Sequence, residues 1–234
     1  IVKLARAQAS KKARQKLYAL LLLAYISVGF WALYMLEPSL ITIFIKTNVD
    51  RTLLGHSIPP SVFYALDPLF IIVLGGVLSY TWTHLARHNK NPSFPTKFSV
   101  SLLIMGLAFV VLVIGTLFSN SDGLCNMLWI VLAYLMFTTA ELLISPIGSA
   151  MVGQLAPEGR EGRLMGAWQL FTGFAAIMAG FLAQFSVTPH HLPPDLAAPV
   201  YMGAFAKIGG ITLLLGVLAW VLTPLVKRLL KHSS

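Results

Sequence analysis

Six long apolar runs constrain the fold of this chain more than any other feature of its sequence. They cover residues 17–44, 60–85, 98–118, 127–152, 164–187 and 204–226. A bilayer core about 30 Å thick requires about 20 apolar residues in a helix, and each run reaches that length. The composition, 57% hydrophobic and only 11% charged, is typical of the same class. We therefore expect an all-α polytopic membrane protein with six transmembrane helices.

Basic residues are distributed unevenly between the two sides of such a bundle. With six spans both termini lie on one side, and of the 17 Lys and Arg residues only Lys46, Arg51 and Lys207 lie on the other. The positive-inside rule then places both termini in the cytoplasm. We expect a basic cytoplasmic linker at residues 1–16 that can lie on anionic membrane lipids, a bundle at 17–226 and a cytoplasmic tail at 227–234. Because the basic residues flank the spans and form no single patch, nucleic-acid binding is not expected.

Glu141 lies in the middle of the fourth apolar run. A polar stripe shares its helical face because its members are three or four residues apart: Tyr134, Thr138, Glu141, Ser145 and Gly148. A carboxylate at this depth costs about 2.5 kcal/mol or more, so it usually marks a substrate or proton path. The alternative is a buried structural carboxylate that holds helices together. Pro146 predicts a bend in the helix close to the acid.

Two further acids lie inside apolar runs, and a proline directly follows each of them. In the first run Glu37 shares a polar and aromatic face with Trp31 and Tyr34, and Pro38 predicts a kink. In the second run Asp67 precedes Pro68. Both acids are candidates for the same path as Glu141. Because each lies toward the external end of its span, each is equally compatible with an acid at a water-filled mouth.

The turn between the fourth and fifth runs carries mixed charges. Arg160 and Arg163 lie close to Glu158 and Glu161, so they are candidates for a gate latch, and a solvated turn is the plain alternative. Trp168, at the start of the fifth run, is either an interfacial anchor or an aromatic wall that faces Glu141.

Other features predict packing or exclude chemistry. Glycines at 166, 173 and 180 predict close helix packing in the fifth run, and the third run, with no charged residue, predicts a peripheral lipid-facing helix. We expect a long external loop at residues 188–199. A lone Cys125 and the adjacent pair His190 and His191 do not make a metal site. With no nucleophile–base pair and no metal-ligand spacing, we expect neither an enzyme nor a cofactor.

Several short motifs then occur in a fixed order. Residues 141–148 read ELLISPIG, 155–157 read LAP, and 165–168 read MGAW. Earlier motifs are FW at 30–31, IP at 58–59 and LDPLFII at 66–72, and later ones are Tyr201, Phe205, Ile208, Gly216 and Pro224. In order and spacing, this set resembles the proton-dependent oligopeptide transporters, a branch of the major facilitator superfamily. The resemblance covers nearly the whole chain.

The resemblance implies that the chain is the C-terminal six-helix half of a twelve-helix carrier. Such carriers import di- and tripeptides with inward-moving protons, as multi-pass proteins of the cell membrane, here a bacterial inner membrane. Glu141 matches the glutamate that pairs with the peptide's amino terminus, and Ser145 matches a neighbouring pocket serine. Trp31 and Trp168 match pocket tryptophans. Asp67 occupies the place of an asparagine that contacts the peptide backbone. The partner of this half would be the N-terminal six-helix half.

The chain also departs from the family pattern. Asp67 adds a titratable acid, which favours a cationic cargo. Glu37 and Pro38 stand near the place where the family has an acid one turn after the tryptophan, so Glu37 can substitute for that acid. Glu37, Asp67 and Glu141 are therefore the candidates for proton coupling, with protons as the coupling ion and no other cofactor. Tyr34 joins the tryptophans as an apolar wall.

Two other interpretations remain open at this stage. One is a non-transporting six-helix membrane subunit with an assembly or sensory role. The other keeps the carrier fold and changes the cargo to another small solute, such as an amino acid. Because the chain begins with Ile, we expect it to be part of a longer polypeptide.

Overall fold

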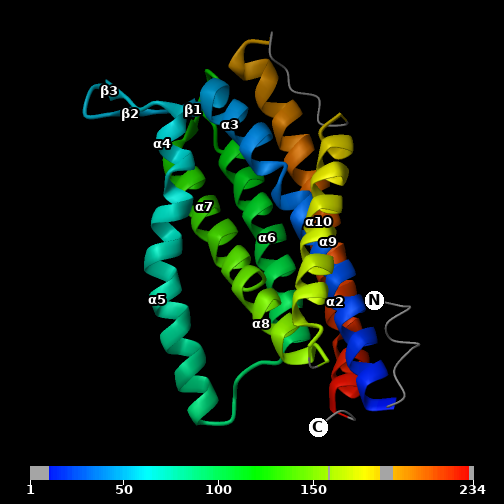
Figure 1. Ribbon diagram of the computed structural model, residues 1–234. Coiled ribbons are helices and arrows are strands. Elements are labelled where there is room, and N and C mark those ends of the chain that lie inside the picture. The colour runs from blue at the N-terminus through cyan, green and yellow to red at the C-terminus, as the bar shows by residue number, and fades with distance from the viewer. Residues whose placement is uncertain (1–10, 158, 185–191, 232–234) are drawn as a thin grey trace.

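A computed structural model of the protein describes residues 11–157, 159–184 and 192–231 (Figure 1). Its helices are α2 (Lys11–Tyr34), α3 (Glu37–Asn48), α4 (Pro60–Tyr64), α5 (Leu66–Arg87), α6 (Phe94–Leu117), α7 (Met127–Leu142), α8 (Ser145–Leu155), α9 (Glu161–Gln184) and α10 (Pro194–Lys231). These helices form six candidate membrane spans, which confirms the expected number. Parts of the predicted linker and tail, Glu158, and the pair His190 and His191 lie outside the described residues.

Three of the six spans are interrupted near a proline. The first is divided into α2 and α3 after Tyr34, the second into α4 and α5 at Ala65, and the fourth into α7 and α8 after Leu142. Pro38 and Pro146 occupy the first turn of α3 and α8. A proline has no N–H and its ring clashes with the preceding turn, so a helix restarts at this residue more easily than it continues through it. The predicted kink and bend are therefore present.

The most extensive helix contact joins α6 to α10, and glycines allow the two helices to approach closely. A Cβ atom on Gly106 would lie 2.7 Å from Leu213 Cγ, and one on Gly216 would lie 2.8 Å from Leu103 Cδ2. Larger residues would therefore push the two helices apart. Thirteen residues of α6 are buried, and Leu107 and Leu117 are its only exposed large apolar residues. The expectation of a peripheral third span was wrong for this half, because α6 packs against α10, α7 and α2.

The surfaces of α5 and α9 are much more open. No residue of α5 is buried, and its main neighbour is α7 (Figure 1). Along α9, nothing described lies within 4 Å of a Cβ built on Gly166, Gly173 or Gly180. The close packing predicted for these three glycines is absent within the described part of the chain.

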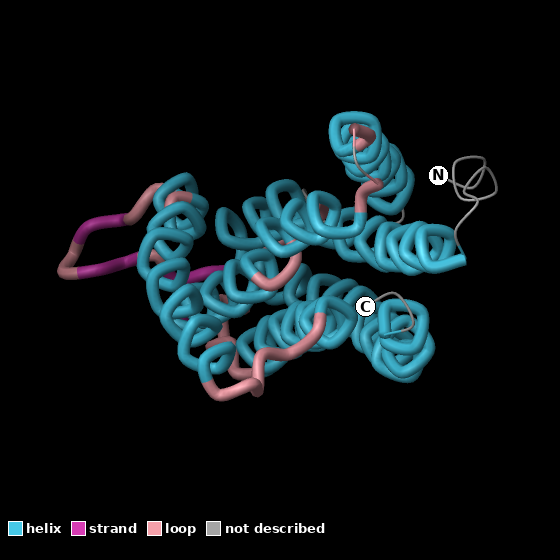
Figure 2. The backbone as a smooth tube through the Cα atoms, turned by 60° about the horizontal axis from the view of Figure 1, so that its bottom comes forward, coloured by secondary structure: helices cyan, strands magenta, loops and turns pink. Residues whose placement is uncertain are grey.

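Short strands and one buried asparagine connect the helices at one end of the bundle. β1 (Val49–Asp50) pairs in parallel with β4 (Cys125–Asn126), and β2 (Thr52–Leu53) pairs with β3 (His56–Ser57) as a hairpin that projects beyond the helices (Figure 2). Asn48 is fully buried, and its Nδ2 donates to the carbonyls of Gly123 at 3.0 Å and Pro194 at 2.7 Å. The bond from Asn48 to Pro194 anchors the start of α10. Because α10 begins at Pro194, the second half of the loop predicted at 188–199 is helical.

Candidate functional site

Each interrupted span carries one of the three predicted acids at its interruption. Glu37 is the first residue of α3, Asp67 is the second residue of α5, and Glu141 is the second-last residue of α7. The carboxyl groups interact electrostatically: Glu37 with both of the others, and Asp67 with Glu141. Three acids from segments far apart in the sequence thus form one cluster. None of them forms an ion pair with a basic residue within the part of the chain that the structure describes.

Two hydrogen bonds between helices fix two members of this acid cluster, Glu141 and Asp67. The Tyr34 hydroxyl on α2 donates to Glu141 Oε2 at 3.0 Å. The Thr138 hydroxyl on α7 lies 2.6 Å from Asp67 Oδ1 on α5 and 2.9 Å from the carbonyl oxygen of Tyr134. The first, second and fourth spans therefore meet at this cluster through polar contacts.

Glu37 is the most enclosed member of the acid cluster, with only 2% of its surface exposed. The fully buried Tyr134 lies close enough to interact with it. Yet Glu37 Oε1 and the Tyr134 hydroxyl are both buried without a well-formed hydrogen bond to any described residue. An unsatisfied pair of this kind is costly, and a small rearrangement would let the Tyr134 hydroxyl donate to the Glu37 carboxylate.

Aromatic side chains on α2 form a wall beside the acid cluster. The Tyr34 ring stacks on Phe30 with centroids 5.6 Å apart, and the Trp31 ring meets both rings edge-on at 5.3 and 5.6 Å. Phe30 is fully buried, whereas Trp31 and Tyr34 are half-buried. The exposed portions of Trp31 and Tyr34 can therefore contact a ligand that also reaches Glu141.

The remaining predicted site residues lie farther from these hydrogen bonds. Ser145 is half-buried and begins α8, directly after the interruption that follows α7. Trp168 is only 4% exposed; its ring lies against Gly148 on α8 and meets Phe98 on α6 edge-on at 6.3 Å. Arg160 directly precedes α9 and Arg163 lies in its first turn, and neither makes an ion pair with a described carboxylate. The predicted gate latch includes Glu158, which is not described, so it stays a prediction.

Tyr134 and Thr138 belong to the cluster, although the sequence did not mark them as site residues. Both lie on the polar stripe of Glu141, Thr138 one helical turn before it and Tyr134 two turns before it. That spacing was the available signal. Their aromatic and hydroxyl side chains alone did not show whether they face an acid or a neighbouring backbone carbonyl.

Six candidate membrane spans with acids at the interruptions of three helices are typical of secondary transporters, a class in which interrupted helices form midplane binding sites. Comparison with known proteins gives the family. The POT family profile matches residues 1–197, and the chain belongs to this family. It is thus a member of a transporter family and not of an enzyme family, as predicted.

Individual relatives agree with this assignment. The chain is 33% identical to dipeptide and tripeptide permease B of Salmonella typhimurium (strain LT2), over 94% of this chain and 45% of the permease. It is 35% identical to dipeptide and tripeptide permease A of Erwinia pyrifoliae, over 95% and 45%. The chain therefore spans about half the length of the curated relatives it matches.

Solved structures match over a similar share. A crystal structure of a mutant peptide transporter POT with alafosfalin has a TM-score of 0.79 and 27% identity, over 95% of this chain and 43% of that one. A structure of peptide transporter POT with sulfate has a TM-score of 0.77 and 29% identity, over 96% and 43%. These matches confirm the predicted family resemblance and the six-helix architecture of one transporter half.

Proposed function

We propose that this chain is the C-terminal half of a carrier that imports di- and tripeptides together with protons. The observation that carries the proposal is the hydrogen-bonded acid cluster beside the aromatic wall, in a chain whose relatives are dipeptide and tripeptide permeases. A zwitterionic peptide that leaves water needs a fixed counter-charge for each of its charges. The acid cluster supplies the negative pole. The N-terminal half of the carrier supplies the positive pole.

In this mechanism Glu141 binds the peptide's ammonium group. Its neighbour Tyr34 donates a hydrogen bond to one carboxylate oxygen, which orients the group and leaves the other oxygen for the ligand. Trp31 and Tyr34 provide apolar walls for variable side chains, and Ser145 adds a hydroxyl beside the pocket. Trp168, packed against Gly148, forms part of the pocket wall on the side of α8 and α9. Arg160 and Arg163 form part of the gate on the cytoplasmic side.

Proton coupling acts through the acids that surround Glu141. The Thr138 hydroxyl has one hydrogen and two oxygen neighbours, Asp67 Oδ1 and the carbonyl of Tyr134. Both contacts become hydrogen bonds when Asp67 carries a proton and donates it to Thr138. Glu37, buried beside Tyr134 without a formed hydrogen bond, is a second place where a proton removes the cost of a buried charge. Proton occupancy of Glu37 or Asp67 and peptide occupancy of Glu141 are therefore linked through the same cluster.

The proposed arrangement in the membrane follows from the charge distribution. Both termini lie in the cytoplasm, with residues 1–16 as a basic linker, 17–226 as the membrane bundle and 227–234 as a tail. The complete carrier is a multi-pass protein of the bacterial inner membrane. Its two six-helix halves rock about a central cavity, and neither nucleic acid nor a metal ion takes part.

The test is uptake of labelled dialanine into proteoliposomes that contain the complete polypeptide carrying this chain. An inward proton gradient should stimulate uptake, and N-acetylated dialanine should fail to compete because it has no free ammonium group. Glu141→Gln should abolish uptake while the protein remains folded. The matched control is Asp122→Asn, an exposed acid in a loop, which should leave uptake unchanged.

The same experiment distinguishes the other functions. Normal uptake by Glu141→Gln would contradict the assigned role of that residue. A folded carrier that moves no peptide but does move an amino acid would change the cargo and keep the mechanism. A folded protein that moves neither cargo would favour a non-transporting membrane subunit.

A further inference from the structure

Lys97 is an enclosed basic residue that the transport mechanism does not use. It is the fourth residue of α6 and is 7% exposed. Its Nζ atom lies 4.2 Å from the centroid of the Trp82 ring on α5, a cation–π contact. The ammonium group forms no ion pair and no hydrogen bond with any other residue in the described ranges. All three of its donors are therefore available to an anion.

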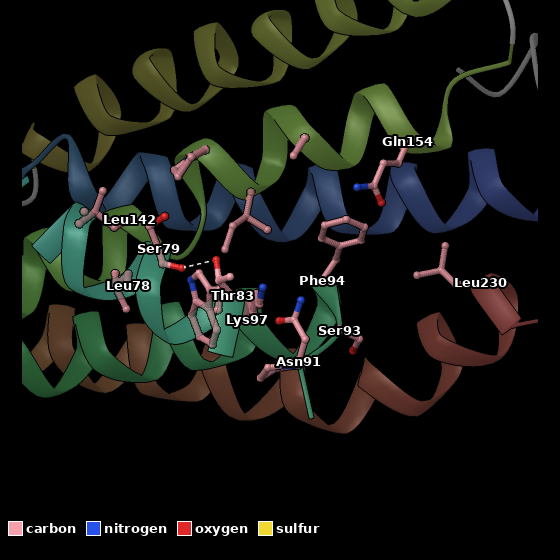
Figure 3. Close-up of a pocket in the computed structure, with 16 residues that line it drawn as sticks. Leu78, Ser79, Thr83, Asn91, Ser93, Phe94, Lys97, Leu142, Gln154 and Leu230 are labelled. Carbon is pink, nitrogen blue, oxygen red and sulfur yellow. Dashed lines mark hydrogen bonds between the residues drawn. The ribbon is translucent and has the colours of Figure 1, made fainter. Parts of the chain in front are cut away.

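Lys97 lines a recess of about 820 Å³ between α5, the start of α6 and α8 (Figure 3). We call it the Lys97 recess. Its polar lining residues are Ser79, Thr83, Asn91, Ser93, Lys97 and Gln154. Its walls contain no Asp or Glu. A negatively charged ligand in the Lys97 recess would therefore meet one cation and several hydrogen-bonding groups, with no like charge on the lining residues.

The N-terminus of α6 opens at the same recess. Ser93 precedes the helix in an extended conformation without a side-chain cap, because its hydroxyl instead lies 2.9 Å from the Thr96 hydroxyl. Pro95 has no N–H, and the N–H groups of Phe94 and Thr96 have no acceptor among the described residues. Free N–H groups at the positive end of a 24-residue helix favour an anion.

The depth of the Lys97 recess suits a membrane headgroup. Trp82 lies five residues before the end of α5, and Lys97 lies three residues after the start of α6. At 1.5 Å per residue, both lie about 5–8 Å from the ends of their helices. The headgroup region on each side of a bilayer is about 5–8 Å thick. The connecting loop adds Lys90, and α5 ends with Arg87, so the surroundings are basic as well.

We infer that the Lys97 recess binds a phosphate group, carried by an anionic phospholipid headgroup or by soluble phosphate. Lys97 donates to the phosphate oxygens, and the first N–H groups of α6 approach them from the helix end. Trp82 holds the ammonium in position through its ring face. The acid cluster takes no part in this site, so the inference stands or falls independently of the proposed transport function.

The first test measures the reactivity of Lys97 in the complete polypeptide, without any mutation. The protein is placed in nanodiscs of phosphatidylcholine, with or without phosphatidylglycerol, and treated with an amine-acetylating reagent before mass spectrometry. At a ligand concentration about ten times the dissociation constant, acetylation of Lys97 should slow about tenfold. The exposed Lys90 in the adjacent loop is the internal control for surface charge and should change little.

A second arm separates the two sources of phosphate. Inorganic phosphate is added to phosphatidylcholine nanodiscs at constant ionic strength. Protection by phosphatidylglycerol alone identifies a lipid site, and protection by inorganic phosphate identifies a site for a soluble anion. Equal acetylation of Lys97 under all conditions would overturn the inference. So would a Lys97 that never reacts, because the recess would then be closed by the rest of the polypeptide.

Variants provide the independent check. Phosphatidylglycerol should raise the unfolding temperature of the wild type and of the control Lys90→Gln, and should not raise that of Lys97→Gln. Lys97→Arg should retain the effect because it keeps the charge and the donors. Equal stabilisation of Lys97→Gln and Lys90→Gln by the lipid would contradict the assigned role of Lys97. If Lys97→Gln does not fold, the acetylation experiment on the unmutated protein still tests whether the Lys97 recess binds phosphate.

Discussion

Thr138 on α7 lies 2.6 Å from Asp67 on α5, and this hydrogen bond connects two spans at the acid cluster. The contact is informative because α5 has no buried residue in this half and packs mainly on α7. A buried or partly buried hydrogen bond to a carboxylate contributes about 1.5–3 kcal/mol. Asp67 is thus the residue that joins α5 to the acid cluster.

Replacing Asp67 by asparagine should change cargo preference without unfolding the carrier. The asparagine oxygen can still accept the hydrogen bond from Thr138, but one negative charge is lost. We expect uptake of lysyl-alanine relative to dialanine to fall about tenfold, which corresponds to about 1.4 kcal/mol. The ratio of initial uptake rates measures the effect, with Asp122→Asn as control. An unchanged ratio would show that Asp67 does not select cationic cargo.

Tyr34→Phe should weaken peptide capture and leave the aromatic wall intact. The ring can still stack on Phe30 and meet Trp31, while the hydrogen bond to Glu141 is removed. Loss of a hydrogen bond to a charged group predicts a rise in the KM for dialanine of about tenfold or more. Tyr25→Phe is the matched control, because Tyr25 is 62% exposed and its hydroxyl makes no hydrogen bond with a described residue. Equal KM values for the two variants would contradict the assigned role of Tyr34 in peptide binding.

Gly148→Ala should destabilise the contact between α8 and α9. The Trp168 ring occupies the position that a Cβ atom on Gly148 would need. Overpacking of this kind costs about 1–3 kcal/mol, so the unfolding temperature in detergent should fall. Gly166→Ala is the control: it has open space around it and should be neutral or stabilising. Adding Trp168→Phe should recover part of the loss, and an unaltered unfolding temperature for Gly148→Ala would contradict this packing.

Cys125 should be unreactive in the folded protein and should make stability depend on alkaline pH. It lies in β4, outside the spans, and burial raises the pKa of its thiol from 9.0 to about 12. Above about pH 9 the unfolded thiol loses its proton and the folded thiol keeps it, so its contribution to stability is lost as pH rises toward 12. Cys125→Ser should show a smaller decline in unfolding temperature between about pH 8 and pH 10. Rapid maleimide labelling of the folded wild type would contradict the prediction.

The spans, their interruptions and most of the acid cluster could be predicted from the sequence because charges and prolines stand out in apolar runs. Three carboxylates interrupt otherwise apolar segments: Glu37, Asp67 and Glu141. Because a carboxylate inside a membrane span costs free energy, each of them is a candidate functional residue. Spacing then placed Tyr34 on the same face as Glu37. The sequence could not show that Tyr34 turns its hydroxyl toward Glu141, because a contact between residues 107 positions apart depends on how the helices pack.

Packing between apolar helices was much harder to predict. Lipid tails are as apolar as leucine, so a helix such as α6 contains no pattern that separates a buried face from a lipid-facing one. For the same reason, glycine spacing predicted close packing at Gly166 and Gly173, where the described part of the structure has none. It did not predict the close contacts at Gly106 and Gly216. The contact of Trp168 with Gly148 likewise depends on the relative rotation of α8 and α9, which a one-dimensional pattern does not specify.

The positions of the acids at helix interruptions have a mechanical consequence. A segment that tilts about an interruption moves most at its far end and least at the pivot. For the 11 residues of α8, about 16 Å long, a tilt of about 10° would displace the far end by about 3 Å. Glu141, beside the pivot, would move only a small fraction of that distance. Interrupted helices can therefore open or close one end of the protein while the charged groups at its centre keep their spacing.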